Sequence, residues 1–234
     1  MTKLQTEKLN VNEVIHDREK FAAVFDHTIL RPDATFDDVR KICAEAIKYH
    51  FASVCVNSCH AALVSDMLKD TGIKTCCVVG FPLGACTSQA KAFEAKCAVD
   101  DGAEEIDMVI NVGYLKSGAY DMVQKDIEAV VAAVFGRAAV KVIIETCLLN
   151  DEEKVTACKL AKAAGAHFVK TSTGFSTGGA NASDVRLMRE TVGEKMGVKA
   201  SGGIRDFETA EAMLEAGANR IGASASAKLI ESMV

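Results

Sequence analysis

Short apolar runs rich in β-branched residues alternate along most of the chain with longer segments of helical spacing. Eight of the runs have the length and composition of buried strands, and a helical pattern follows each one. The predicted strands cover residues 25–30, 51–56, 73–80, 104–110, 140–146, 166–172, 197–202 and 219–224. Several helices are predicted to end at a glycine, as in DDGAEE, AAGAHF and EAGANR, because glycine accepts the left-handed position after a last turn.

This alternation predicts a parallel sheet built from βαβ units. Eight units in one chain of 234 residues favour a single (β/α)8 TIM barrel in the α/β class. An open doubly wound sheet is the alternative, but no G-x-G-x-x-G follows the first strand. No Pro/Gly/Ser linker is visible, so residues 1–234 are expected to form one domain, with residues 1–25 as an N-terminal helical extension.

Charge and cysteine content narrow the classes of function. The net charge of −5 argues against a broad surface for nucleic acid or an anionic membrane, so an anionic ligand would be held locally. Nine cysteines, an odd number, mostly fall inside apolar patterns, which indicates reduced thiols. Neither a signal peptide nor a run long enough to span a bilayer is apparent, so a cytoplasmic protein is expected.

In a TIM barrel, chemistry belongs at the carboxyl ends of the strands. The residues predicted to stand there are Asn57, Asp107, Asn111, Glu145, Lys170, Lys199, Gly222 and Ser224.

Two of these residues are lysines on strands predicted to be neighbours. Alternation along a strand turns Lys170 inward with Phe168, and Lys199 inward with Gly197. Two ammonium groups ~5 Å apart at an effective dielectric of ~20 repel by roughly 3 kcal/mol, which favours loss of one proton. A neutral amine is the nucleophile that forms a Schiff base. A lone lysine at a strand end would more simply extend into solvent, but a pair makes that interpretation weaker.

An acidic residue is predicted to join the lysines. Asp107 stands among apolar residues in EEIDMVIN, either as a buried ion-pair partner or as a group that moves protons. Lys141, in AVKVIIET, is a third candidate, and its spacing leaves open whether it points inward or outward.

Glycine-rich loops follow the last two strands. ASGGIR contains Gly202 and Gly203, and RIGASA contains Gly222 and Ser224. Each loop alone could be an ordinary tight turn, but this pair of loops frequently holds phosphate in TIM barrels. Asp206 is predicted to cap the helix that follows the first loop.

Other polar residues fit structural roles better. CVNSCH offers two cysteines and one histidine, too few for a structural zinc site, and no other cluster has ligand spacing. Cys55 is therefore predicted to point into the barrel, with Cys59 and His60 on the next helix. His27 is interpreted as a hydrogen-bonded structural residue. No metal and no cofactor are expected.

Taken in order, the motifs resemble those of deoxyribose-phosphate aldolase. These are FDHTIL, SVCVN, VVGFPLG, EIDMVINVG, VKVIIET, FVKTSTGF, VKASGGIR and RIGAS, from about residue 25 to residue 224. The resemblance implies a (β/α)8 barrel and a metal-free class I aldolase, a lyase of deoxyribonucleotide catabolism. Such an enzyme cleaves 2-deoxy-D-ribose 5-phosphate reversibly to acetaldehyde and D-glyceraldehyde 3-phosphate.

The same resemblance implies roles for individual residues. Lys170 would form the Schiff base, and Asp107 and Lys199 would be the proton donor and acceptor pair. Cys55 would line the acetaldehyde side, and Lys141 is included among the substrate-binding candidates. The residues implied to hold the phosphate are Gly174, Gly202, Gly203, Gly222 and Ser224.

The chain departs from the family pattern at three places. Ser58 replaces a usual proline, Ala225 follows Ser224 where a second hydroxyl is common, and the sequence ends in ESMV without the tyrosine that assists proton transfer in some members. Two other functions stay open: a different Schiff-base barrel enzyme of the transaldolase type, and a non-catalytic barrel that binds a sugar phosphate. Oligomeric state is also open, with a homodimer as the candidate assembly.

Overall fold

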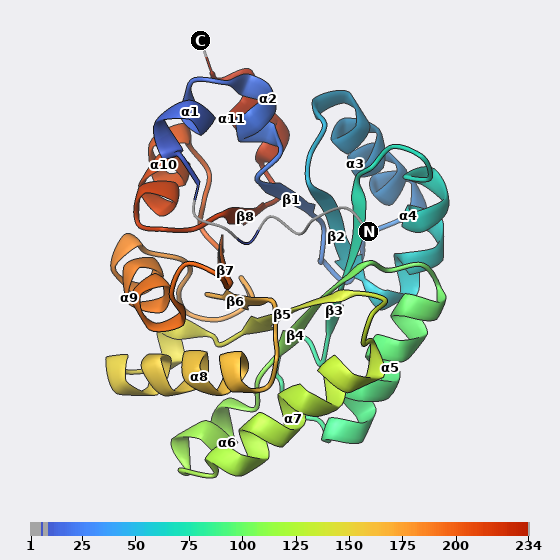
Figure 1. Cartoon of the computed structure of the whole chain (residues 1–234). Coiled ribbons are helices and arrows are strands. Elements are labelled where there is room, and N and C mark those ends of the chain that lie inside the picture. Colours follow the sequence, from blue (N-terminus) through green and yellow to red (C-terminus); the bar gives the residue numbers. More distant parts are fainter. Residues whose placement is uncertain (1–5, 7–8, 234) are drawn as a thin grey trace.

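The computed structural model describes residue 6 and residues 9–233. Eight parallel strands close into one barrel in chain order, which confirms the predicted (β/α)8 fold (Figure 1). The strands are β1 (Phe25–Thr28), β2 (Ser53–Asn57), β3 (Lys74–Val79), β4 (Glu105–Val109), β5 (Ala139–Ile143), β6 (Phe168–Lys170), β7 (Gly197–Ser201) and β8 (Arg220–Ala223). Each predicted strand overlaps one of them, with ends displaced by a few residues.

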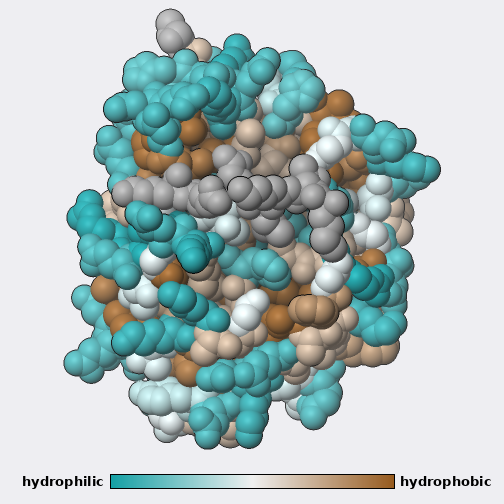
Figure 2. All heavy atoms as spheres, viewed as in Figure 1, coloured by the Kyte–Doolittle hydropathy of each residue, from teal (hydrophilic) through white to brown (hydrophobic). Residues whose placement is uncertain are grey.

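Helices fill the connections and form the outer layer (Figure 1). They are α3 (Phe36–Tyr49), α4 (Ala61–Met67), α5 (Ser88–Asp100), α6 (Val112–Lys116), α7 (Tyr120–Ala133), α8 (Asp151–Ala163), α9 (Ala182–Val192), α10 (Phe207–Glu215) and α11 (Ser226–Glu231). Two 3-10 turns, η1 (Ser58–His60) and η2 (Thr146–Leu148), follow β2 and β5. Figure 2 shows that hydrophilic side chains cover much of this helical layer on the face in view.

Two short helices precede the barrel. α1 (Val11–Ile15) lies beside α10, and α2 (Arg18–Ala22) lies beside α11 (Figure 1). Phe21 of α2 is fully buried, with its ring 5.0 Å from that of Phe25 and 5.3 Å from that of Phe207. These aromatic contacts fix the two helices against the outer layer. The remainder of the predicted extension, residues 1–5 and 7–8, lies outside the described residues.

The predicted helix ends are confirmed. Gly102, Gly165 and Gly217 have φ angles of 101°, 81° and 112°, which let the chain leave a helix and enter the next strand. Asp206 caps α10, because its carboxylate accepts a hydrogen bond of 2.8 Å from the backbone N–H of Thr209.

Alternation along the strands separates two environments. Ile106 and Met108 of β4 point outward and are fully buried in the apolar layer beneath the helices. Glu105 and Asp107 alternate with them and point into the barrel, where they meet charged residues from other strands. The barrel interior is therefore polar at this level, while the apolar core lies outside it. Within the described residues, no helix has the length and apolar character needed to cross a membrane.

Candidate active site

Register between neighbouring strands brings the predicted residues together. Lys170 of β6 is aligned with Lys199 of β7, and Asp107 of β4 is aligned with Lys141 of β5. All four side chains point into the barrel and are at most 2% exposed. The question that spacing left open is therefore settled, because Lys141 points inward.

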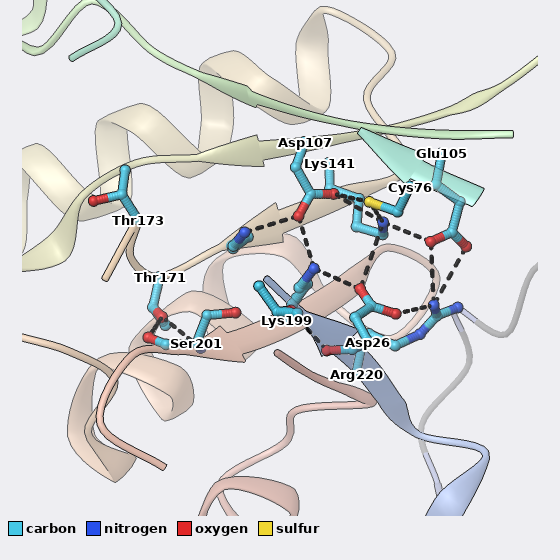
Figure 3. A network of polar contacts seen from close by, with 12 residues as sticks. Asp26, Cys76, Glu105, Asp107, Lys141, Thr171, Thr173, Lys199, Ser201 and Arg220 are labelled. Carbon is cyan, nitrogen blue, oxygen red and sulfur yellow. Dashed lines mark hydrogen bonds and ion pairs between the residues drawn. The ribbon is translucent and has the colours of Figure 1, made fainter. Parts of the chain in front are cut away.

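Asp107 is the centre of this group (Figure 3). Its Oδ2 accepts hydrogen bonds from Nζ of Lys170 at 2.8 Å and Nζ of Lys199 at 2.7 Å. Its Oδ1 accepts one from Nζ of Lys141 at 2.8 Å and one from the Cys76 thiol at 3.2 Å. One carboxylate thus orients three ammonium groups from three strands.

A further set of charges lies next to it in the barrel. Asp26 of β1 lies 2.5 Å from Nζ of Lys199 and 2.6 Å from the guanidinium of Arg220. Glu105 lies 2.6 Å from Nζ of Lys141 and 3.2 Å from Arg220. Ser53 also donates a hydrogen bond of 2.7 Å to Asp26.

These residues form what we call the buried charge cluster. Its members are Asp26, Glu105, Asp107, Lys141, Lys170, Lys199 and Arg220. Three carboxylates therefore face four basic groups, so the fully ionised cluster carries one excess positive charge. Among the basic groups, Lys170 alone contacts a single carboxylate of the cluster; each of the others contacts two or more. A neutral Lys170 leaves the remaining charges balanced.

The environment keeps Asp107 and Lys199 ionised. Burial alone would raise the pKa of Asp107, but the ammonium groups of Lys141, Lys170 and Lys199 hold that pKa well below its ordinary value. Burial would lower the pKa of Lys199, but the carboxylates of Asp107 and Asp26 outweigh it and raise that pKa. Lys199 is thus a lasting positive charge beside Lys170.

A small apolar surface adjoins the lysines. Cys55, Cys76 and Val78 are buried together, with Leu30 and Phe81 packed against them. A hydrogen bond from the Cys76 thiol lowers the pKa of the neighbouring Cys55, while burial opposes that shift. This group therefore presents carbon and sulfur atoms next to the lysines.

Three of the candidate glycines, Gly174, Gly202 and Gly203, lie beyond the ends of β6 and β7, and Gly222 lies within β8. Gly174, Gly202 and Gly203 have φ angles of 84°, 89° and 81°, a conformation that side chains disfavour. A Cβ on Gly222 would lie 2.4 Å from Oγ of Ser201, so that position cannot carry a side chain without movement. Gly203 and Ser224 are exposed at this end of the barrel.

His27 has a different environment. Its side chain is 2% exposed, and Nε2 lies 2.7 Å from the carboxylate of Glu45 in α3. Burial lowers the pKa of His27 and Glu45 opposes the shift. The contact with α3 supports the structural role predicted for this histidine.

Comparison with known proteins identifies the family. A family model described as DeoC/LacD family aldolase matches residues 20–228. The chain belongs to this aldolase family. It is 65% identical over 206 residues to deoxyribose-phosphate aldolase of Clostridium tetani, which covers 88% of this chain and 95% of that protein. The resemblance that the motifs indicated is confirmed.

Other relatives agree. The deoxyribose-phosphate aldolase of Caldanaerobacter subterraneus is 60% identical over 212 residues, covering 90% of this chain and 92% of that one. A solved deoxyribose phosphate aldolase from Aeropyrum pernix, described as having a unique tetrameric structure, superposes with a TM-score of 0.88 at 34% identity. It covers 95% of this chain and 94% of its own.

Among the described residues of this aldolase, two groups have atoms close enough for a metal ion. One consists of Cys55, Cys76 and Asp107, and the other of Asp26, Cys76 and Glu105. The carboxylates in both groups already bind ammonium or guanidinium groups, so a divalent cation would face strong repulsion from several positive charges. The absence of a metal stays a prediction.

Sequence reasoning missed part of the cluster. Asp26, Glu105 and Arg220 were not identified as site residues, although Glu105 and Arg220 each obey the same alternation as a residue that was. Glu105 stands two positions before Asp107, and Arg220 stands two before Gly222. The period-two alternation of inward-facing positions could therefore have identified Glu105 and Arg220.

Glu145 was predicted to stand at a strand end, and no role was predicted for it. In the structure it contacts Thr173, in the loop that follows Lys170. Its carboxylate accepts hydrogen bonds from Oγ1 of Thr173 at 2.5 Å and from the Thr173 backbone N–H at 3.2 Å. Thr173 Oγ1 in turn accepts one from the Phe175 N–H at 3.1 Å. Glu145 itself is 4% exposed and has a left-handed φ of 57°. It thus positions the loop that follows Lys170.

We predict that Glu145→Gly raises the KM of the aldolase reaction by about tenfold, because a buried N–H left unpaired costs roughly 1–3 kcal/mol. Glycine keeps the left-handed backbone, so the variant isolates the carboxylate. Glu145→Gln retains one acceptor and should recover much of the loss. Steady-state kinetics on both variants provide the measurement. Equal KM values for Glu145→Gly and the unmodified enzyme would show that the loop holds its position without this carboxylate.

Proposed function

We propose that this aldolase cleaves 2-deoxy-D-ribose 5-phosphate reversibly to acetaldehyde and D-glyceraldehyde 3-phosphate through a Schiff base on Lys170. The observation that carries the proposal is the buried charge cluster, in which Lys170 is the basic group with the fewest carboxylate partners. The identity to deoxyribose-phosphate aldolases supports the substrate.

The chemistry requires an electron sink, because breaking the C2–C3 bond leaves an electron pair on C2. Neutral Lys170 attacks the C1 aldehyde, and the adduct loses water to give an iminium ion. A base removes the proton of the C3 hydroxyl, the C2–C3 bond breaks, and the electron pair forms an enamine while D-glyceraldehyde 3-phosphate leaves. Protonation of C2 and hydrolysis of the resulting iminium then release acetaldehyde and regenerate the amine.

The cluster supplies what each step needs. Asp107 faces the nitrogen of Lys170 and stabilises the positive iminium as it stabilises the ammonium. Lys199 donates to the same Oδ2 of Asp107 that Lys170 contacts. Lys199 and Asp107 act as the donor and acceptor pair for the protons at C3 and C2, with water as a carrier. Lys141 holds the other carboxylate oxygen and so fixes the orientation of Asp107.

The apolar surface distinguishes this reaction from a transaldolase reaction. Cys55, Cys76 and Val78 would contact the methyl end of acetaldehyde. A ketose donor would bring hydroxyl groups to the same surface and leave them without partners, at a cost in binding free energy. The backbone N–H groups of Gly202, Gly203 and Gly222, with the hydroxyl of Ser224 and the turn at Gly174, would hold the phosphate.

The nucleophile can be trapped directly. Incubation with acetaldehyde and sodium borohydride is expected to convert one lysine to N-ethyl lysine, and peptide mass mapping should place it at Lys170. Lys170→Arg preserves the positive charge and should abolish both trapping and deoxyribose 5-phosphate cleavage in a coupled assay. Modification at Lys199 or Lys141 would overturn the assignment.

A metal-dependent reaction would give a different result in the same assay. With the iminium as electron sink, cleavage should survive exhaustive treatment with EDTA. Activity lost to EDTA and restored by zinc would contradict the Schiff-base proposal. A chain that is trapped by no aldehyde and cleaves no sugar would instead be a binding protein.

A separate prediction concerns the charge balance. Lys199→Met removes a lasting positive charge, so the three carboxylates then favour the protonated form of Lys170. The acidic limb of the pH–rate profile is expected to move to higher pH, and kcat should fall about 100-fold or more because proton transfer is also impaired. Lys74→Met is a matched control, since Lys74 pairs with Glu104 at a partly exposed strand start. An unchanged profile for Lys199→Met would make that lysine a bystander.

Binding of the phosphate gives another prediction. Hydrogen bonds to a charged group contribute roughly 1.5–3 kcal/mol each, so kcat/KM for the 5-phosphate should exceed that for 2-deoxyribose by two or more decades. Gly203→Val should reduce this ratio, because a side chain there meets no protein atom within 4 Å and would enter the space of the anion. Gly118→Val is the control, with a φ of 73° and the same open surroundings but no place in the site. Equal loss of the ratio in both variants would indicate backbone strain alone.

A further inference from the structure

Two serines each stand two residues after a lysine of the buried charge cluster. Ser201 follows Lys199 by two residues within β7, so alternation turns both toward the barrel interior. Ser172 follows Lys170 by two residues, just beyond the end of β6. Ser172 is fully buried and Ser201 is 6% exposed. Within the part of the chain that the structure describes, neither hydroxyl has a hydrogen-bond partner.

Neighbouring hydroxyls on the same segments are satisfied. Oγ1 of Thr171 donates to the carbonyl of Ser201 at 3.1 Å and accepts from its N–H at 3.0 Å. Thr173 is bonded to Glu145. Buried polar groups are normally paired, because an unpaired one loses its bonds to water without compensation. Two unpaired buried hydroxyls, each two residues after a lysine of the buried charge cluster, therefore indicate groups that a ligand satisfies.

Their neighbours locate that ligand. A Cβ built on Gly222 would lie 2.4 Å from Oγ of Ser201 and 3.0 Å from Cε of Lys199, so this hydroxyl lies between the lysine side chain and Gly222. Figure 3 shows Ser201 beside Lys199. A Cβ built on Gly202 would lie 3.6 Å from Cβ of Ser172. Ser201 thus lies between Lys199 and Gly222, and Ser172 lies beside Gly202.

We propose that Ser172 and Ser201 bind the hydroxyl that the acceptor aldehyde carries on the carbon next to its carbonyl. The inference rests on the proposed function, which puts the reacting carbons at Lys170 and the phosphate at the glycine loops. The part of the substrate between those points carries one hydroxyl that takes no part in bond cleavage. A serine hydroxyl both donates and accepts, so the pair suits a neutral hydroxyl group and discriminates against an acceptor that lacks it.

The test compares two acceptors that differ only in this hydroxyl. Acetaldehyde is condensed with D-glyceraldehyde 3-phosphate or with 3-oxopropyl phosphate, and kcat/KM is measured for each acceptor. The unmodified enzyme is expected to favour the hydroxylated acceptor by about tenfold or more, since a site built to bind a hydroxyl rejects an analogue without it. In Ser172→Ala/Ser201→Ala that preference should fall to about twofold or less, mainly through loss on the hydroxylated acceptor.

Ser226→Ala provides a matched control. Ser226 is also fully buried near the end of β8, but its hydroxyl already donates to the carbonyl of Ala223 at 2.9 Å. Loss of this hydroxyl should leave the ratio of the two acceptors unchanged. Circular dichroism first compares the fold of each variant with that of the unmodified enzyme. If the double variant does not fold, the single variants Ser172→Ala and Ser201→Ala are measured in its place.

Deuterium exchange into the methyl group of acetaldehyde tests the proposed function separately from this inference. Exchange requires the enamine but no acceptor, so its absence in the unmodified enzyme would overturn the proposed function and the inference together. A second outcome would overturn the inference alone. In it, the unmodified enzyme catalyses exchange, and the double variant loses exchange rate by the same factor as condensation rate. That result would assign the two hydroxyls to proton transfer. An acceptor ratio that the double variant leaves unchanged would also overturn it.

Discussion

The carboxylate of Asp107 is the contact on which the site depends, because it joins three lysines that would otherwise repel one another. Such a group of charges is stable inside a protein only when opposite charges and hydrogen bonds compensate the loss of water. Here Asp26 and Glu105 extend the compensation to Arg220, and each strand from β4 to β8, together with β1, supplies a charged side chain. The closed barrel is what brings these strands to one axis.

The buried charge cluster holds three carboxylates and four basic groups, and this imbalance bears on its chemistry. The three carboxylates neutralise Lys141, Lys199 and Arg220, all buried and tied to two or more acidic partners. Lys170 is the fourth basic group and contacts Asp107 alone among the three carboxylates. In the proposed mechanism, the iminium that forms on Lys170 would meet the same carboxylate that the free side chain contacts.

Much of this fold and part of this site could be predicted from the sequence. Period-two alternation placed Lys170 and Lys199 together, because both stand two residues after another inward residue on neighbouring strands. It did not settle Lys141, whose direction depends on the register that aligns it with Asp107. Asp26 was passed over beside His27, since one strand alone does not say which of two adjacent polar residues faces the axis. Partners on distant strands decide that, and a linear sequence does not contain them.

Small residues inside the barrel are as necessary as the charged ones. A Cβ on Gly197 would lie 2.1 Å from the ring of Phe168, and one on Gly222 would crowd both Lys199 and Ser201. Long side chains reach the axis only because glycine on the neighbouring strand leaves room for them. An apolar filling of the same volume would often be as stable or more stable than buried ion pairs. The charged interior is therefore better explained by the proposed reaction than by the fold, since that reaction requires an amine, a proton path and a fixed carboxylate at one level.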